Sequence, residues 1–208
     1  MSNILKRDGL SVEILRDLSY KSRLGINLKN NLHYFDKQLL FEELQAANAW
    51  YSETGLLAGL ALDYRIKSMQ SAVHKYERYY PDHQARKVFD DLLGFRSLCD
   101  NYDDIYLLQS EDHFRVADMS KGKANDDGYR GVHVYFQLSG THYPIEIQYN
   151  TFFDRQLNNW LHKYVYKKGY SSETGAVLRK RYEKGEIPNE NTFKEVLSSV
   201  LSGCKTCR

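Results

Sequence analysis

The sequence predicts an α/β fold of the α+β kind, with a mixed sheet of about five strands flanked by helices. Apolar residues recur at helical spacing over residues 32–50. Residues 132–138 instead alternate between apolar and polar side chains, and residues 142–149 alternate again. Ser139-Gly140 separates the two alternating segments, and so short a turn joins antiparallel strands. Helices and strands interleave without a regular βαβ rhythm, so the sheet is expected to be mixed.

The first part of the chain is expected to be helical. Helices are predicted over residues 11–23 and 32–50, where apolar residues follow the helical period. A charged, amphipathic helix is predicted through Met69 and Tyr80, and Pro81 ends it because proline has no N–H to donate. The sheet is therefore expected in the C-terminal two thirds of the chain.

The second part changes its period. A strand is predicted within Val88–Cys99, a short helix over Asp103–Gln109 and a further strand at Phe114–Val116. Residues 121–128 (KGKANDDG) are polar and lack periodicity, which predicts a loop. Helices follow at about 151–168, 172–184 and 191–202, the last with Asn191 as its expected N-cap.

No repeat or linker divides the sequence, so we expect a single domain over residues 1–208. Within it, residues 1–56 form N-terminal helices, residues 57–168 the core and residues 169–208 a helical extension. A net charge of +2 is too small to indicate a nucleic-acid partner by itself. No run of 18 apolar residues predicts a membrane span, and Met1–Leu10 lacks the apolar centre of a secretory signal. A cytoplasmic protein is expected.

The three cysteines do not form a disulfide framework. Cys99 lies in an apolar run and is expected in the core. Cys204 and Cys207 form a C-x-x-C pair, but no second pair of Cys or His residues lies near them. A zinc or redox role for this pair and a plain reduced tail both remain open.

The predicted hairpin gathers polar side chains on one face. With Ser139-Gly140 as the turn, paired positions sum to 279, so His133 lies opposite Glu146. Because side chains alternate in direction, two faces follow. The apolar face holds Val132, Val134, Ile145 and Ile147, and the polar face holds His133, Tyr135, Glu146 and Gln148. The polar face is either exposed to solvent or the floor of a polar site.

The loop before this hairpin has the composition of a phosphate-binding segment. Lys121 and Lys123 can close over phosphates, with Arg115 upstream, and Tyr129 can stack on a base. The alternative is a solvated loop beside a core tyrosine.

Two earlier clusters also favour anion or metal binding. The first holds Arg65, Lys67, Ser71 and Lys75 near the start of a predicted helix, where anions are attracted. The alternative is an ordinary basic helix face. The second holds Asp91 at the start of a strand and Arg96 five residues later, which suits a metal and a nucleotide or, alternatively, a salt bridge at a strand edge.

Taken in order, these clusters resemble the synthetase domain of the RelA/SpoT family. The pattern reads Arg65-x-Lys67-x-x-x-Ser71-x-x-x-Lys75, Asp91-x-x-Gly94-x-Arg96, Gly128-Tyr129-Arg130-Gly131-Val132-His133 and Glu146-Ile147-Gln148. The match covers roughly residues 57–168, and its most specific part runs from Gly128 to Gln148.

The resemblance implies an ATP-dependent pyrophosphokinase, which transfers the β,γ-pyrophosphate of ATP to a ribose 3′-hydroxyl. It implies Asp91 and Glu146 as ligands of Mg²⁺, with Glu146 also activating the hydroxyl. It implies that Tyr129 stacks on the base of the acceptor, while His133 and Gln148 contact the acceptor. The implied ATP contacts are Arg65 and Arg96 at the adenine and Lys67, Ser71, Lys75, Lys121 and Lys123 at the phosphates, and the position of Arg115 upstream of the loop predicts that it joins them. Phosphoryl chemistry agrees, because it requires cations at the phosphates and a base for the hydroxyl.

Two departures from the family pattern concern the acceptor. Relatives carry an arginine where this chain has Asn150, so a guanidinium near the acceptor phosphates is missing. Relatives also carry Glu before His where this chain has Leu161 before His162. Both departures favour a resemblance to the toxic small synthetases, which pyrophosphorylate the 3′ CCA end of tRNA and inhibit translation.

The acceptor is therefore expected to be tRNA, with an antitoxin protein as a further partner. The C-terminal segment offers a docking surface for tRNA phosphates, made of Lys163, Lys167, Lys168, Arg179, Lys180, Arg181 and Lys184. A solvated helix face explains the same residues. Two alternatives stay open: GDP or GTP as the acceptor, which yields ppGpp or pppGpp, and a catalytically inactive nucleotide-binding protein. Retention of both Asp91 and Glu146 argues against the inactive protein.

Overall fold

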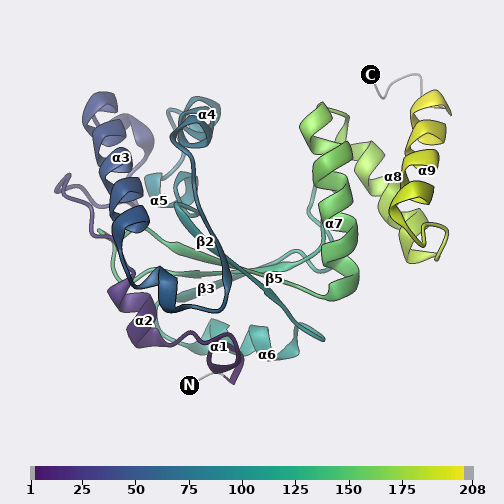
Figure 1. Ribbon diagram of the computed structural model, residues 1–208. Helices are drawn as coiled ribbons and strands as arrows, with labels where there is room; N and C mark the ends of the chain where they lie inside the picture. The colour runs from purple at the N-terminus through teal and green to yellow at the C-terminus, as the bar shows by residue number, and fades with distance from the viewer. Residues whose placement is uncertain (1–2, 204–208) are drawn as a thin grey trace. The chain divides into compact units, whose positions relative to one another are not determined.

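The computed structural model describes residues 3–203 and contains one five-stranded sheet with flanking helices (Figure 1). The strands lie in the order β1-β2-β5-β4-β3. Their bounds are Asp63–Ile66 (β1), Leu93–Leu98 (β2), Phe114–Asp118 (β3), Val132–Phe136 (β4) and Ile145–Asn150 (β5). The expected α+β fold with a mixed sheet of about five strands is confirmed.

The chain divides into two compact units. Unit 1 holds the residues up to 97 together with 103–116 and 133–148, and unit 2 holds 98–102, 117–132 and the residues from 149 onward. The expectation of a single domain over residues 1–208 stays a prediction.

Unit 1 holds most of the helices, and short polar residues cap three of them. The helices of unit 1 are α1 (Asn3–Arg7), α2 (Val12–Asp17), α3 (Lys37–Glu53), α4 (Met69–Tyr79), α5 (Ala85–Val88) and α6 (Asp103–Tyr106), with 3-10 turns at Leu32–Tyr34, Leu57–Gly59 and Leu107–Ser110. Ser11, Asp36 and Ser68 each accept the backbone N–H three residues later, as N-caps do. Within this unit, Figure 1 shows α3, α4 and α5 on one side of the sheet and α1, α2 and α6 on the other.

The helix predicted over residues 11–23 is too long, since α2 ends at Asp17. The backbone beyond it bonds to the β4–β5 connection instead: Ser22 N–H donates to the Thr141 carbonyl and Leu28 N–H to that of Gly140, both at 2.8 Å. These tertiary hydrogen bonds replace the helical ones. The helix predicted over 32–50 begins late, at Lys37, because Asp36 caps it.

The hairpin turn lies one residue later than predicted. His142 N–H donates to the Ser139 carbonyl at 3.1 Å, so Gly140 and Thr141 are its central residues. Moving a turn by one residue changes the sum of paired positions by two, and every side chain therefore keeps its face. The apolar face is confirmed, because its four residues are fully buried: Val132, Val134, Ile145 and Ile147.

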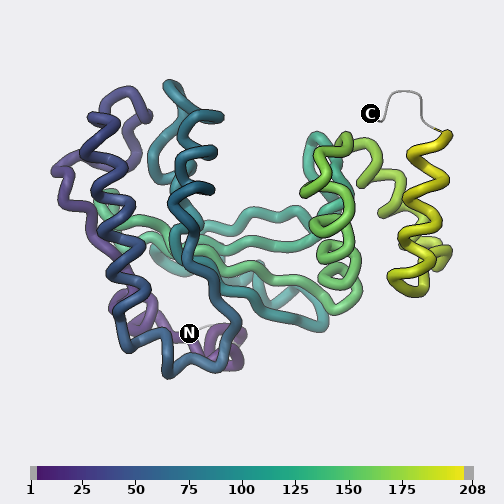
Figure 2. Tube along the Cα trace, turned by 45° about the horizontal axis from the view of Figure 1, so that its top comes forward, coloured from purple at the N-terminus to yellow at the C-terminus, as the bar shows by residue number. Residues whose placement is uncertain are grey.

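The helices of unit 2 are α7 (Phe152–Tyr164), α8 (Ser172–Glu183) and α9 (Glu190–Gly203), with a 3-10 turn at Tyr166–Lys168. They lie side by side in Figures 1 and 2, and their shared core includes Trp160, Leu178 and Phe193. The predicted N-cap of the last helix is wrong, because Asn189 Oδ1, not Asn191, accepts the N–H groups of residues 191 and 192 at 3.0 Å.

No helix formed by residues 3–203 is both long and apolar enough to cross a membrane. Cys99 is buried as expected. The Cys204 and Cys207 pair lies outside the described residues.

Candidate active site

The antiparallel pair β1–β2 forms one wall of the candidate site. Its register sets Arg65 opposite Gly94, and Arg96 lies two residues beyond Gly94 on the same face. The side chains of Arg65 and Arg96 are 52% and 41% exposed. Their planar guanidinium groups are therefore open to a ligand with an aromatic ring.

Asp91, two residues before β2 begins, is held by cations. Lys67 Nζ lies 2.6 Å from Asp91 Oδ2, Lys75 Nζ 3.0 Å from Oδ1 and Arg65 Nη2 3.4 Å from Oδ2. Burial raises the pKa of Asp91, but the charges of Lys75 and Lys67 outweigh it and lower the pKa overall. Asp91 is therefore ionised at neutral pH.

Glu146, the second residue of β5, is fixed through both carboxylate oxygens. His133 Nδ1 lies 2.9 Å from Glu146 Oε1, and the Tyr135 hydroxyl donates to the same atom at 3.1 Å. Gln148 Nε2 donates to Oε2 at 2.7 Å. Burial raises the pKa of Glu146, but the hydrogen bond and charge of His133 lower it overall. The carboxylate is therefore ionised and oriented.

These two carboxylates line the same small hollow. Its lining residues are Arg65, Asp91, Gly94, Phe95, Arg96, Glu146 and Gln148. Two of the sequence clusters, 91–96 and the polar hairpin face, thus meet in unit 1 together with Arg65. Ser71 lies apart from this lining, exposed in the first turn of α4, where the Ser68 hydroxyl donates to its Oγ.

The sequence reasoning missed two residues of this cluster, Asp90 and Tyr135. Asp90 Oδ1 lies 3.2 Å from Lys75 Nζ, and Oδ2 lies 3.8 Å from Arg115 Nη2. Burial raises the pKa of Tyr135, and the charge of Glu146 raises it further. The signal for Tyr135 was present, since it belongs to the predicted polar face. Asp90 directly precedes Asp91, but its neighbours Lys75 and Arg115 could not be foreseen.

The neighbours Asp90 and Asp91 are expected to affect stability in opposite directions. Burial raises the pKa of Asp90. The charge of Lys75 lowers this pKa, but the charges of Asp91 and Glu146 raise it, and the pKa is raised overall. Because the pKa of Asp90 is raised in the folded protein, ionisation of Asp90 lowers stability at neutral pH. The pKa of Asp91 is lowered instead, so ionisation of Asp91 stabilises the fold, and this stabilisation is lost as the pH falls below 3.8, the ordinary pKa of an aspartate.

Asp90→Asn should therefore raise the free energy of unfolding at pH 7, by less than ~1 kcal/mol. Asp91→Asn should lower it by about 2–4 kcal/mol, because Lys67 would keep a buried charge without its closest partner. Urea unfolding of both variants at pH 7 measures the two signs. Equal destabilisation by both substitutions would contradict the assignment.

Three predicted site residues lie in unit 2, and the other ten lie in unit 1. Lys121 is exposed in the loop after β3. Lys123 Nζ lies 2.7 Å from Asp127 Oδ2 and 5.0 Å from the ring centroid of Tyr129. The predicted loop is confirmed, and its lysine already contacts the predicted stacking tyrosine within the same unit.

The structure corrects the predicted C-terminal docking surface. Arg179 is fully buried, and its Nη1 lies 2.8 Å from Asp154 Oδ1, so it cannot meet a tRNA phosphate. Other cations of the surface pair with acids within unit 2: Lys163 with Glu190 and Arg181 with Glu186. The exposed cations that remain are Lys167, Lys168, Lys180 and Lys184.

Asn150 also has an internal role. Its side chain is 1% exposed, and Nδ2 donates to the Arg130 carbonyl at 2.8 Å. Gly131 packs closely against it, because a Cβ there would lie 2.4 Å from Asn150 Nδ2. The side chain of Asn150 supports the loop backbone and offers no hydrogen bond to a phosphate. The presence of asparagine here, where relatives carry arginine, therefore does not identify the acceptor.

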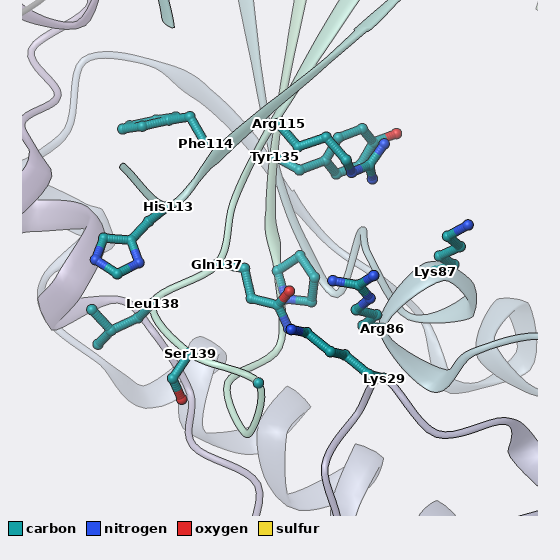
Figure 3. A pocket seen from close by; sticks show the side chains of 12 residues that line it. Lys29, Arg86, Lys87, His113, Phe114, Arg115, Tyr135, Gln137, Leu138 and Ser139 are labelled. Carbon is teal, nitrogen blue, oxygen red and sulfur yellow. The ribbon is translucent and has the colours of Figure 1, made fainter. Parts of the chain in front are cut away.

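A larger cavity of about 410 Å³ borders the carboxylate cluster in unit 1 (Figure 3). Lys29 reaches it from a loop, and Arg86 and Lys87 reach it from α5. None of these three cations has a carboxylate partner within residues 3–203, although Arg86 Nε donates to Gln84. Arg115 and Tyr135 also line the cavity, with the guanidinium carbon 4.0 Å from the ring centroid. We call this space the cationic cavity.

Comparison with known proteins places the chain in a family. The model for the "Region found in RelA / SpoT proteins" matches residues 64–171, which is 108 of the 208 residues. A search of curated proteins finds no match.

Several solved structures are similar to this chain. Small alarmone synthetase 1 from Bacillus subtilis, bound to its product pppGpp, is 24% identical, with 68% of this chain and 77% of that chain covered and a TM-score of 0.43. Small alarmone synthetase 2 from Bacillus subtilis is 20% identical, with 79% and 96% covered and a TM-score of 0.43. A GTP pyrophosphokinase family protein from Streptococcus pneumoniae is 18% identical, with 79% and 87% covered and a TM-score of 0.41.

The family match covers more than half of the chain, and it contains the hollow with both carboxylates and both arginines. The chain therefore belongs to the RelA/SpoT family of pyrophosphokinases.

Proposed function

We propose that this chain transfers the β,γ-pyrophosphate of ATP to the 3′-hydroxyl at the CCA end of tRNA. One observation supports the transfer above all others: two buried carboxylates with lowered pKa, Asp91 and Glu146, line one hollow with two half-exposed arginines. In this proposal the arginines, Arg65 and Arg96, stack on the adenine of ATP, and Lys67 and the nearby cations face its phosphates.

The donor set of this hollow fits Mg²⁺. Among residues 3–203, no three His, Cys, Asp or Glu side chains are grouped to hold a metal ion. Mg²⁺ does not need such a group, because it keeps several waters and binds through one or two carboxylates plus substrate phosphates. Asp91 and Glu146 would hold it together with ATP. When bound, the ion would neutralise the charge of the phosphates.

Glu146 is the proposed general base. A carboxylate oxygen of Glu146 takes the proton of the 3′-hydroxyl while the 3′-oxygen of the ribose bonds to the β-phosphorus. The bond from the β-phosphorus to the oxygen shared with the α-phosphate breaks, and AMP leaves with that oxygen. His133, Tyr135 and Gln148 hold the carboxylate in place through three polar contacts. The lowered pKa of Glu146 keeps it deprotonated and ready at neutral pH.

The cationic cavity is the proposed entry for the acceptor. Tyr135 connects it to the base, because its ring lines the cavity while its hydroxyl donates to Glu146. Lys29 from a loop and Arg86 and Lys87 from α5 supply positive charge that no carboxylate neutralises within residues 3–203, which suits a polyanion with several phosphates. A protein that blocks the 3′ end of tRNA would stop translation, so an antitoxin protein is the expected partner.

The labelling pattern tests this function. The chain is incubated with γ-labelled ATP, Mg²⁺ and either tRNA, GDP or GTP. Label should migrate with tRNA and should vanish when the terminal ribose of the tRNA has been oxidised by periodate, which removes the 3′-hydroxyl. Label mainly on GDP or GTP would make the protein an alarmone synthetase. No transfer to any acceptor would make it an inactive nucleotide-binding protein.

Tyr129→Ala is expected to impair use of the acceptor selectively. Stacking on a base contributes about 1–3 kcal/mol, so the KM for the acceptor should rise roughly ten- to a hundredfold. The affinity for ATP should change little, and Tyr129→Phe should keep most of the activity because the ring remains. Steady-state kinetics with each substrate varied in turn measures this. An equal loss of ATP affinity in Tyr129→Ala would show that the tyrosine serves the donor or the core.

A further inference from the structure

Helix α8 meets the loop around Tyr129 at unusually close range. We define the Tyr129 loop as residues 126–131. Gly128 has a φ of +87°, and a Cβ at this position would lie 2.3 Å from the Gly175 carbonyl oxygen of α8. A Cβ at Gly175 would in turn lie 1.9 Å from the Asp127 carbonyl oxygen. The two backbones can approach so closely only because both positions, 128 and 175, are glycine.

Arg179 lies one helical turn after Gly175 and binds the same loop. It is fully buried, and Nε donates to the Gly128 carbonyl at 2.7 Å. Nη1 donates to Asp154 Oδ1 at 2.8 Å, and Nη2 donates to Asn158 Oδ1 at 3.0 Å. Burial lowers the pKa of Arg179, although the charge of Asp154 opposes this effect. All three guanidinium nitrogens are thus committed within unit 2.

Asn158 passes this restraint to the other side of Tyr129. Its Oδ1 accepts the Arg130 N–H at 3.2 Å, and its Nδ2 donates to the Arg130 carbonyl at 2.6 Å. Tyr166 adds a bond from its hydroxyl to the Asp127 carbonyl at 2.9 Å. The backbone is therefore fixed directly before and directly after Tyr129.

Stability alone does not explain the buried charge of Arg179, because burying a charge costs free energy and a well-packed apolar side chain often stabilises a fold equally well. The three directional bonds of Arg179 instead fix the position of a backbone carbonyl next to Tyr129. Helix α8 begins at Ser172, directly after the family-matched residues 64–171. The restraint is thus added to the matched core by a neighbouring element.

We infer that α8 holds the Tyr129 loop in the conformation that receives the acceptor, with Arg179 as its positioning residue. This inference rests on the proposed function, in which Tyr129 stacks on the base of the acceptor. Arg179 itself touches neither substrate in this arrangement. Its loss should consequently affect acceptor binding and leave ATP binding in unit 1 unchanged.

Three variants of the full chain test the inference. Arg179→Gln removes the guanidinium, Tyr166→Phe removes one bond to the loop without a change of shape, and Val177→Ala is the control on an exposed site of α8. We expect the KM for the acceptor that takes the label to rise roughly tenfold or more in Arg179→Gln and about threefold in Tyr166→Phe. The KM for ATP should stay within about twofold in all three, because the substitutions leave the proposed ATP contacts Arg65, Lys67 and Arg96 of unit 1 unchanged.

Amide hydrogen exchange provides a readout that does not depend on activity. Exchange at residues 126–131 should accelerate in Arg179→Gln and Tyr166→Phe and stay unchanged in Val177→Ala. An unchanged acceptor KM in folded Arg179→Gln, or an equal rise in the KM for ATP, would overturn the inference. Should Arg179→Gln fail to fold, an unchanged acceptor KM in Tyr166→Phe overturns it.

Failure of the proposed function is distinguishable from failure of this inference. If Tyr129→Ala leaves the acceptor KM unchanged, the proposed role of the tyrosine is wrong, and the inference about acceptor positioning falls with it. If Tyr129→Ala raises the acceptor KM while the Arg179 and Tyr166 variants do not, the proposed function stands and only the positioning role is wrong.

Discussion

Glu146→Gln should lower kcat for pyrophosphate transfer roughly 10³-fold or more while the protein stays folded and still binds ATP. The amide matches the carboxylate in shape, so Gln148 and Tyr135 keep a partner of the same size. It cannot take the hydroxyl proton, and it brings no negative charge to the metal. Single-turnover transfer from labelled ATP measures the loss, and circular dichroism confirms the fold.

The matched control is Glu77→Gln, the same substitution at an exposed position of α4. It should leave transfer unchanged. A Glu146→Gln protein that keeps more than about a tenth of the wild-type rate would remove Glu146 from the mechanism. Asp91→Asn should also abolish transfer, but it is the less clean test because it also removes a partner of buried Lys67.

The double variant Arg86→Glu with Lys87→Glu should reduce labelling of tRNA by about two decades at moderate salt. Both cations line the cationic cavity, and each substitution replaces an attraction for phosphate by a repulsion. A plot of the logarithm of the tRNA binding constant against the logarithm of the salt concentration should have a slope that is shallower by about two, since two phosphate contacts are lost. The affinity for ATP should not change, because neither residue lines the hollow that holds Asp91 and Glu146.

The matched comparison is Lys180→Glu with Lys184→Glu, which reverses two exposed cations in unit 2. If this pair weakens tRNA labelling and the cavity pair does not, tRNA docks on the C-terminal surface and the role of the cationic cavity is wrong. If neither pair has an effect and GDP takes the label, the acceptor is a mononucleotide.

In cells, a tRNA-modifying protein should stop growth while alarmone levels stay flat, and the cavity variant should relieve that arrest.

The sequence alone determined those features that depend on local periodicity. Alternation along residues 132–149 predicted the two faces of the hairpin, and the prediction survived a one-residue error in the turn because the alternation has a period of two. The order and spacing of Asp91, Arg96 and Glu146 also predicted the family, and the family match over residues 64–171 confirms it. Helix ends were less certain, as the early end of α2 shows, because long-range hydrogen bonds compete with helical ones.

Which charges are available to a ligand depends on the folded arrangement of the chain. Arg179 and Lys180 are adjacent basic residues, but only Lys180 is exposed. Arg179 is buried, and its partners Asp154 and Asn158 come from a different helix, α7. Lys29 and Arg86 showed no pattern in the sequence, yet the fold brings them to one cavity beside Tyr135. The physical reason is that the state of a charge depends on burial and on partners within a few ångströms, and such partners come from segments that are distant along the chain.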